Sequence, residues 1–172
     1  MLTQVLGDFG AEVIKVEPSE GDPVRTMGQQ HDGHSLYAAS IFRNKKLISI
    51  ELRRPDGHAL VREIAAKSDV VVENFKPGTL EGWGLGFEDL RKLNPNLVLT
   101  SITPCGQTGP YAQFQGEEIV YYAMGGAMSG TGVEEREPVK LGGNIVQYQC
   151  GNLAAMATVA ALLTVEAGHE AI

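Results

Sequence analysis

Residues 74–76 carry the most suggestive chemistry in the chain, because Asn74, Phe75 and Lys76 place an amide, an aromatic ring and a cation side by side. They directly follow an apolar run, residues 69–73, that is typical of a buried strand. Open α/β sheets bind ligands at the carboxyl ends of their strands. An amide and an aromatic face can hold a heterocycle, and a lysine can hold a phosphate. The spacing alone leaves open whether this segment is a ligand site or a plain turn.

A pair of carboxylates and two basic clusters are the other candidates for chemistry. Glu117 and Glu118 precede an apolar pair, so one carboxylate can point into a cleft as an acid or base. Both can equally be charges in a first helical turn, where the helix dipole favours them. The basic clusters, residues 43–46 and 53–54, flank an expected strand and offer either an anion site or solvated charge.

Two glycine-rich stretches and the histidines are assigned to structure rather than to chemistry. Residues 82–86 lack the GxGxxG spacing of a dinucleotide site, and residues 125–132 are not followed by the Lys-Ser or Lys-Thr of a P-loop. These absences disfavour a nicotinamide-dependent enzyme and a nucleoside triphosphatase. None of the histidines accompanies a Ser or Cys nucleophile at a recognisable motif. We interpret them as surface residues: His31, His34, His58 and His169.

The composition is that of one globular domain. The chain has 172 residues, 43% of them hydrophobic, and a net charge of −7, the wrong sign for neutralising nucleic-acid phosphates. Cys105 and Cys150 are far apart and have no metal-ligand spacing. No signal peptide is apparent, and the longest apolar stretch, residues 153–165, is shorter than the ~20 residues of a membrane span. We therefore expect a cytoplasmic protein with a core helix there and no membrane or nucleic-acid partner.

Hydrophobic periodicity predicts strands and helices that alternate along the first hundred residues. Strand, helix and strand in this order are typical of an α/β doubly wound sheet. One predicted helix, which starts at Pro55, carries Leu60, Val61, Ile64 and Ala65 on an apolar face. The predicted strands are residues 11–17, 47–52, 69–73 and 97–102, and the predicted helices are residues 2–9, 55–65, 77–83, 87–93, 116–124 and 144–168.

Five motifs together resemble family III CoA-transferases. They are LGDFGAEVIKVEP at 6–18, GDPVR at 21–25, RNKK at 43–46, DVVVENFKPG at 69–78 and GQTGPY at 106–111. This family, also called CaiB/BaiF, includes formyl-CoA transferase, carnitine CoA-transferase and alpha-methylacyl-CoA racemase. The resemblance implies a Rossmann-like, mostly parallel sheet with flanking helices. It also implies that residues 1–172 are part of the CoA-binding large domain, without the family's first strand and small domain.

The resemblance also implies a ligand and a set of contacts. Coenzyme A enters as a substrate, in an acyl-CoA donor that passes it to a small carboxylic acid, and neither a metal nor a nicotinamide is expected. Ile50, Arg53, Asn74 and Phe75 match family positions that contact the nucleotide end of CoA. The full-length family member is expected to form an interlocked homodimer.

One departure from the family concerns the reacting group. The transferases use an aspartate nucleophile at the start of the last helix here, and that position is Gln147. The His of the racemases falls at Glu117, and residues 144–149 contain no carboxylate. A carboxamide is too weak a nucleophile for this role. The open alternatives are a transferase in which Glu117 or Glu118 does this work, a catalytically impaired CoA-binding half, and a racemase relative.

Overall fold

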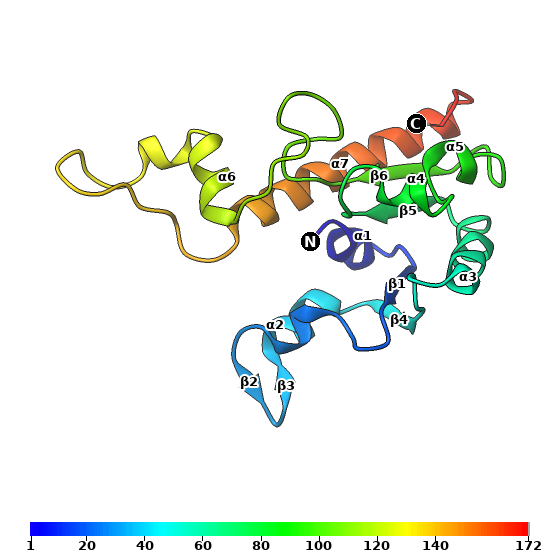
Figure 1. The fold of residues 1–172 in the computed structure, drawn as a ribbon, viewed down its shortest axis with the longest axis horizontal. Helices are drawn as coiled ribbons and strands as arrows, with labels where there is room; N and C mark the ends of the chain where they lie inside the picture. The colour runs from blue at the N-terminus through cyan, green and yellow to red at the C-terminus, as the bar shows by residue number, and fades with distance from the viewer. Residues whose placement is uncertain (172) are drawn as a thin grey trace.

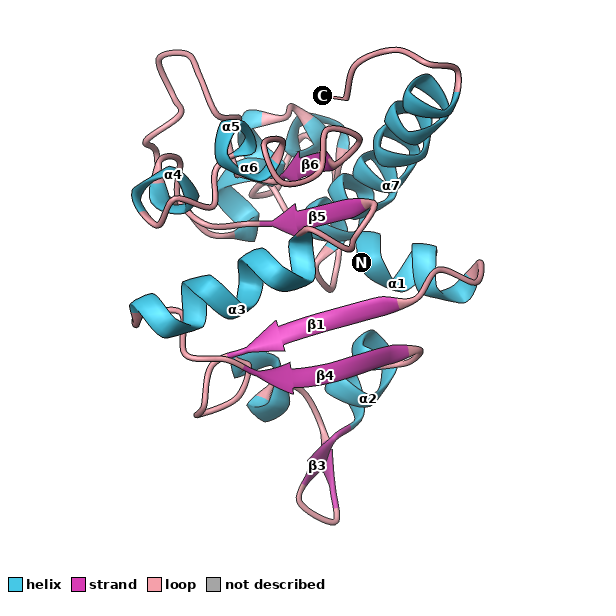
Figure 2. Cartoon of the chain, turned by 90° about the vertical axis from the view of Figure 1, so that its right-hand side faces the viewer, coloured by secondary structure: helices cyan, strands magenta, loops and turns pink. Residues whose placement is uncertain are grey.

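Four short parallel strands form the framework of the computed structural model, which describes residues 1–171. They are β1 (Val13–Glu17), β4 (Lys45–Ser49), β5 (Val70–Glu73) and β6 (Val98–Ser101). β1 pairs with β4 in the register Val13 to Lys45, and β5 pairs with β6 in the register Val70 to Val98. Figure 2 shows the two pairs as separate ribbons whose arrowheads point the same way. The α/β class and the parallel pairing predicted from sequence are confirmed.

Within residues 1–171 the two strand pairs are not hydrogen-bonded to each other. Helix α3 carries the chain from β4 to β5 (Figure 2). β4 begins two residues before the predicted range of 47–52 and ends three residues before the end of that range, at Ser49. Ile50 therefore lies just beyond the strand. Its first two residues are lysines, whose place in a strand comes from backbone pairing with β1 rather than from apolar alternation.

The helices agree with the predicted pattern in most places. They are α1 (Leu2–Asp8), α2 (Leu36–Phe42), α3 (Pro55–Ala65), α4 (Thr79–Gly82), α5 (Phe87–Leu90), α6 (Glu118–Met124) and α7 (Ile145–Glu166), with two 3-10 turns, Pro23–Thr26 and Ala127–Gly130. α4 and α5 are shorter than predicted. α2 and the hairpin of β2 (Gln30–His31) and β3 (His34–Ser35) were not predicted. Figure 1 shows that the stretch around α6 extends away from the strands.

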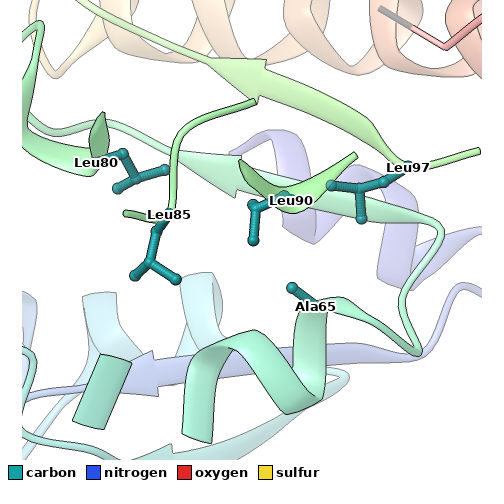
Figure 3. Packing of buried hydrophobic residues seen from close by; sticks show 5 residues of the cluster. All are labelled: Ala65, Leu80, Leu85, Leu90 and Leu97. Atoms are coloured by element: carbon teal, nitrogen blue, oxygen red, sulfur yellow. The ribbon is translucent and has the colours of Figure 1, made fainter. Parts of the chain in front are cut away.

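The hydrophobic core lies between α3, the α4 to α5 region and the β5–β6 pair. Figure 3 shows its five buried residues: Ala65, Leu80, Leu85, Leu90 and Leu97. Val61 packs against this cluster from α3, as its place on the predicted apolar face requires. The prediction was wrong for Leu60, which is 51% exposed, because the helix turns the neighbouring position away from the core.

The last helix, α7, buries one face only. Gly151, Ala155 and Thr158 lie on that face, and Thr158 is hydrogen-bonded to Thr100 of β6 at 2.7 Å. Gly151 permits close approach of α1, because a Cβ there would overlap Met1. The prediction of a core helix needs correction, since the helix spans 22 residues and its opposite face is exposed. By length and composition α7 can cross a membrane, but one such helix is weak support for a membrane span.

Candidate functional site

The loop after β4 presents two of the residues expected to contact CoA. Ile50 is buried, with only 5% of its surface exposed, and its backbone N–H donates to the carbonyl of Glu17 at 2.9 Å. Gly57 in the first turn of α3 lets the helix approach this loop, because a Cβ there would overlap the carbonyl oxygen of Glu51. The loop is therefore fixed to β1 at one end and to α3 at the other.

Arg53 lies on the exposed side of the same loop. Its guanidinium pairs with Glu20 at 2.9 Å, and its side chain is 75% exposed. Its backbone N–H donates to Oε1 of Glu51 at 3.0 Å, which holds the loop in a turn. Because an exposed ion pair contributes little free energy, a phosphate can displace Glu20 from the guanidinium at small cost.

Asn74 and Phe75 follow β5, on the side of the molecule to which both strand pairs point (Figure 2). The N–H of Phe75 donates to Oε2 of Glu73 at 2.7 Å, and the residue is 37% exposed. The ring also meets Trp83 edge to face, with centroids 5.1 Å apart. Asn74 and Phe75 help to line a cavity of about 230 Å³. The other lining residues are Lys76, Pro77, Pro104, Ala112, Gln113, Phe114, Gln115, Gly116 and Tyr121.

The helix that contributes Tyr121 to this cavity also carries one of the two candidate carboxylates, which is not itself a lining residue. Tyr121 lines the cavity from α6, and Glu118 lies three residues before it on the same helix. Oε1 of Glu118 accepts a hydrogen bond from the N–H of Val146 at 2.7 Å. Within residues 1–171, Oε2 of Glu118 and the hydroxyl of Tyr121 are buried and have no hydrogen-bond partner. Such unsatisfied oxygens are rare in proteins and point to a place where a ligand or water supplies the missing partner.

Glu117 has a different environment from Glu118. It is exposed and occupies the N-cap position of α6 without a capping hydrogen bond from its side chain. The structure therefore gives the two neighbouring carboxylates different environments, which the sequence alone could not distinguish. Glu118 faces the start of α7, and Glu117 faces solvent.

Gln147 lies in the first turn of α7 and is exposed. It follows Val146, whose N–H is bound by Glu118, so the Glu118 carboxylate lies at the same helix terminus as Gln147. The positive end of the helix dipole stabilises a negative charge at this place. A carboxylate is thus present at the start of α7, although the helix itself supplies none there.

Two tyrosines that sequence reasoning missed also lie at this helix start. The hydroxyl of Tyr37 in α2 accepts hydrogen bonds from Tyr148 and from the amide of Asn144, both at 3.3 Å. The hydrogen bond to Tyr37, burial and the nearby charge of Glu118 together raise the pKa of Tyr148 to about 12. Tyr148 therefore stays a neutral hydrogen-bond donor at neutral pH. No local pattern indicates this contact, because its partners are 111 residues apart.

Comparison with known proteins identifies the family. The family model described as CoA-transferase family III matches residues 1–171. The chain belongs to this family. It is 46% identical over 161 residues to succinyl-CoA–D-citramalate CoA-transferase of Chloroflexus aurantiacus, an alignment that covers 92% of this chain and 40% of the relative. It is 44% identical over 163 residues to human succinyl-CoA:glutarate CoA-transferase, covering 94% of this chain and 37% of the relative.

Solved structures agree with the assignment. A CaiB/BaiF family protein from Brucella suis superimposes with a TM-score of 0.91 at 40% identity, covering 97% of this chain and 46% of that one. The family and fold predicted from sequence are therefore confirmed. This family III chain spans about two fifths of the length of the curated relatives it matches. Within its described residues, no group of three or more His, Cys, Asp or Glu is placed to hold a metal ion.

Proposed function

We propose that this family III chain binds the CoA moiety of an acyl-CoA and takes part in transfer of CoA to a carboxylic acid. The observation that carries the proposal is the cavity of about 230 Å³ between the Asn74 segment and α6. One wall holds groups suited to CoA, and the other holds Tyr121, on the same helix as the unpaired carboxylate oxygen of Glu118. Family membership supports CoA thioesters as the substrates.

The nucleotide end of CoA fits the exposed side of the two loops. Arg53 can pair with a phosphate through a charge-assisted hydrogen bond, and Ile50 supplies apolar surface beneath the loop. Asn74 can hydrogen-bond the adenine edge, while the exposed face of Phe75 covers the ring. The pantetheine arm then extends along the cavity toward α6.

Glu118 is the proposed nucleophile. Its carboxylate attacks the thioester carbonyl carbon of the donor and expels CoA thiolate, which gives a mixed anhydride. The thiolate attacks the glutamyl carbonyl of that anhydride, so that the donor acid leaves and CoA remains as a thioester on Glu118. The acceptor carboxylate attacks this thioester and releases the thiolate again. The thiolate then attacks the acceptor carbonyl of the new anhydride, which frees the new acyl-CoA and regenerates the Glu118 carboxylate.

The hydroxyl of Tyr121 is the proposed oxyanion donor. It is buried and without a partner, like Oε2 of Glu118, and a hydrogen bond to the developing oxyanion would use it. The acyl groups are proposed to be those of short dicarboxylic acids. The names of the two curated relatives support this class, since one acts on citramalate and the other on glutarate, both with succinyl-CoA.

The test is transfer and trapping with one pair of substrates. The protein is incubated with succinyl-CoA and glutarate, glutaryl-CoA is measured by chromatography, and the intact protein mass is measured after the donor alone. We expect glutaryl-CoA and a CoA adduct, both lost in Glu118→Gln and retained in Glu117→Gln, the matched control. An adduct that persists in Glu118→Gln would show that another group is the nucleophile.

A second candidate function is that of a CoA-binding half without catalysis. The presence of Gln147 in place of the family's aspartate favours it, because no carboxylate then lies on α7 itself. This alternative predicts CoA binding without an adduct in the wild-type protein. A racemase role is less favoured, since the position of the racemase histidine is Glu117, which faces solvent.

We also propose that family III chains of this kind pair as homodimers in the cytoplasm. The exposed side chains of Leu153, Met156 and Leu163 on α7 support a covered apolar face. Light scattering coupled to gel filtration tests the pairing, and a monomer at micromolar concentration would contradict it.

A further inference from the structure

The two loops expected to hold CoA come from strand pairs that share no backbone hydrogen bonds. The loop with Ile50 and Arg53 follows β4, and the segment with Asn74 and Phe75 follows β5. A ligand that spans both loops needs them at a fixed separation. Side-chain contacts between the two loops are one source of that fixed separation.

An aromatic stack joins the two loops. His58 in the first turn of α3 is hydrogen-bonded through Nε2 to the carbonyl of Leu52 at 2.8 Å. Because a carbonyl only accepts, Nε2 of His58 carries the hydrogen. The His58 ring stacks on Trp83, with centroids 5.4 Å apart and planes at 24°, and Trp83 in turn meets Phe75. The prediction that His58 is a surface residue is thus wrong, since it is half-buried between the loop and Trp83.

Trp83 is itself held firmly. It packs against the core cluster of Leu80 and Leu85. Arg62 of α3 reaches over to donate hydrogen bonds to the carbonyl of Gly84 at 2.9 and 3.1 Å and to that of Trp83 at 3.4 Å. The indole is therefore a fixed wall between α3 and the end of α4, and Phe75 rests against it.

We propose that Trp83 and His58 are positioning residues that set the distance between the phosphate-binding and adenine-binding loops of the CoA site. This inference rests on the proposed function. Trp83 holds the Phe75 ring in the orientation that presents its exposed face to the base, and His58 links the Trp83 ring to the loop of Arg53. The pair therefore affects the adenosine 3′,5′-bisphosphate part of CoA and leaves the pantetheine part alone.

The single tryptophan makes the inference measurable. Trp83 is the only tryptophan in the chain, so its fluorescence reports this wall without interference. Adenosine 3′,5′-bisphosphate is expected to change the emission, and pantetheine is not. Calorimetry then gives the dissociation constants of CoA, adenosine 3′,5′-bisphosphate and pantetheine for the wild type, Trp83→Leu, Trp83→Phe and His58→Gln.

The expected pattern separates positioning from general damage. Loss of one aromatic contact weakens CoA and the bisphosphate between about twofold and tenfold in Trp83→Leu, while Trp83→Phe restores most of the affinity. Pantetheine affinity stays unchanged in all variants. Phe9→Leu is the control, because Phe9 is 90% exposed and caps the end of α1, before β1 begins, whereas the two loops follow the ends of β4 and β5.

Two results would overturn the inference while leaving the proposed function intact. One is wild-type affinity for CoA in both Trp83→Leu and His58→Gln. The other is an equal loss of bisphosphate and pantetheine affinity, which indicates general unfolding rather than positioning. If the wild-type chain binds none of the three ligands, the proposed function itself is wrong.

Discussion

Replacement of Glu118 tests whether this carboxylate only caps α7 or also reacts. Its Oε1 accepts the N–H of Val146 at 2.7 Å, in the first turn of a 22-residue helix. Loss of a side-chain cap costs about 0.5 to 2 kcal/mol, and hydrogen bonds to charged groups lie at or above the top of that range. Glu118→Ala, which removes the acceptor, is therefore expected to cost about 2 kcal/mol.

Glu118→Gln separates the two roles. The amide oxygen still accepts the N–H of Val146, so only the interaction of the charge with the helix dipole is lost, about 0.3 to 1 kcal/mol. For a chain of this size, 1 kcal/mol moves the melting temperature by roughly 2 to 4 °C. We therefore expect a fall of about 4 to 8 °C in Glu118→Ala and of about 1 to 4 °C in Glu118→Gln. The carboxamide is a very poor nucleophile, so the CoA adduct should be absent from both variants.

The assay pairs thermal unfolding, followed by circular dichroism, with intact-mass detection of the adduct. Glu117→Ala serves as the control, because Glu117 is exposed and makes no capping hydrogen bond. An adduct on Glu118→Gln would show that Glu118 is not the nucleophile. A wild-type melting temperature in Glu118→Ala would show that the hydrogen bond to α7 contributes nothing to stability.

Three further predictions concern the start of α7, the loop after β4 and the ion pairs of β1. Gln147→Asp places a second carboxylate at the predicted position of the family's nucleophile, where repulsion with Glu118 should leave the transfer rate unchanged or lower by single-turnover kinetics, whereas a rise of about tenfold or more would show that position 147 rather than Glu118 suits the reacting carboxylate. Arg53→Ala should weaken CoA about tenfold by calorimetry but 3′-dephospho-CoA much less, and equal losses would place the 3′-phosphate elsewhere. Burial acts to raise the pKa of Glu17, but Arg25 and Lys15 outweigh it and hold that pKa below 4.5. The ion pairs of Glu17 therefore stabilise the fold above the unfolded pKa, and this stability is lost as the pH falls through the lower folded pKa. In Glu17→Gln the free energy of unfolding should depend less steeply on pH in the acid range. Identical plots of unfolding free energy against pH for the variant and the wild type would contradict this.

The sequence was sufficient for the strands and the long helix because their signals are local. Runs of β-branched residues mark β1 and β5, and a long alanine-rich stretch marks α7. The start of β4 was missed because Lys45 and Lys46 belong to the strand only through pairing with β1. α2 was missed because it has only seven residues, and its cap, Ser35, is a single polar residue in a polar stretch.

The sequence was enough to predict which segments form the candidate site, but not which side chains contact one another there. The Asn74 segment was found because it follows the apolar residues of β5, and it lines a cavity in the structure, while its role in ligand binding stays a prediction. The contacts of Trp83 with His58 and of Tyr37 with Tyr148 join residues 25 and 111 positions apart in the chain. Neither helical nor strand periodicity carries information over such separations, so these partners emerge only from the tertiary fold.

The start of α7 offers a reason for the glutamine at position 147, where the sequence resemblance predicts an aspartate. The helix N-terminus stabilises one negative charge, and Glu118 already supplies it through its hydrogen bond to Val146. A second carboxylate at the exposed position 147 would lie at the same helix start as Glu118 and repel it, which raises the cost of keeping both ionised. Gln147 removes that repulsion and leaves Glu118 as the single anion at this helix start. If Glu118 is the nucleophile, the substitution therefore moves the reactive carboxylate from α7 to the neighbouring α6 while keeping it at the same dipole.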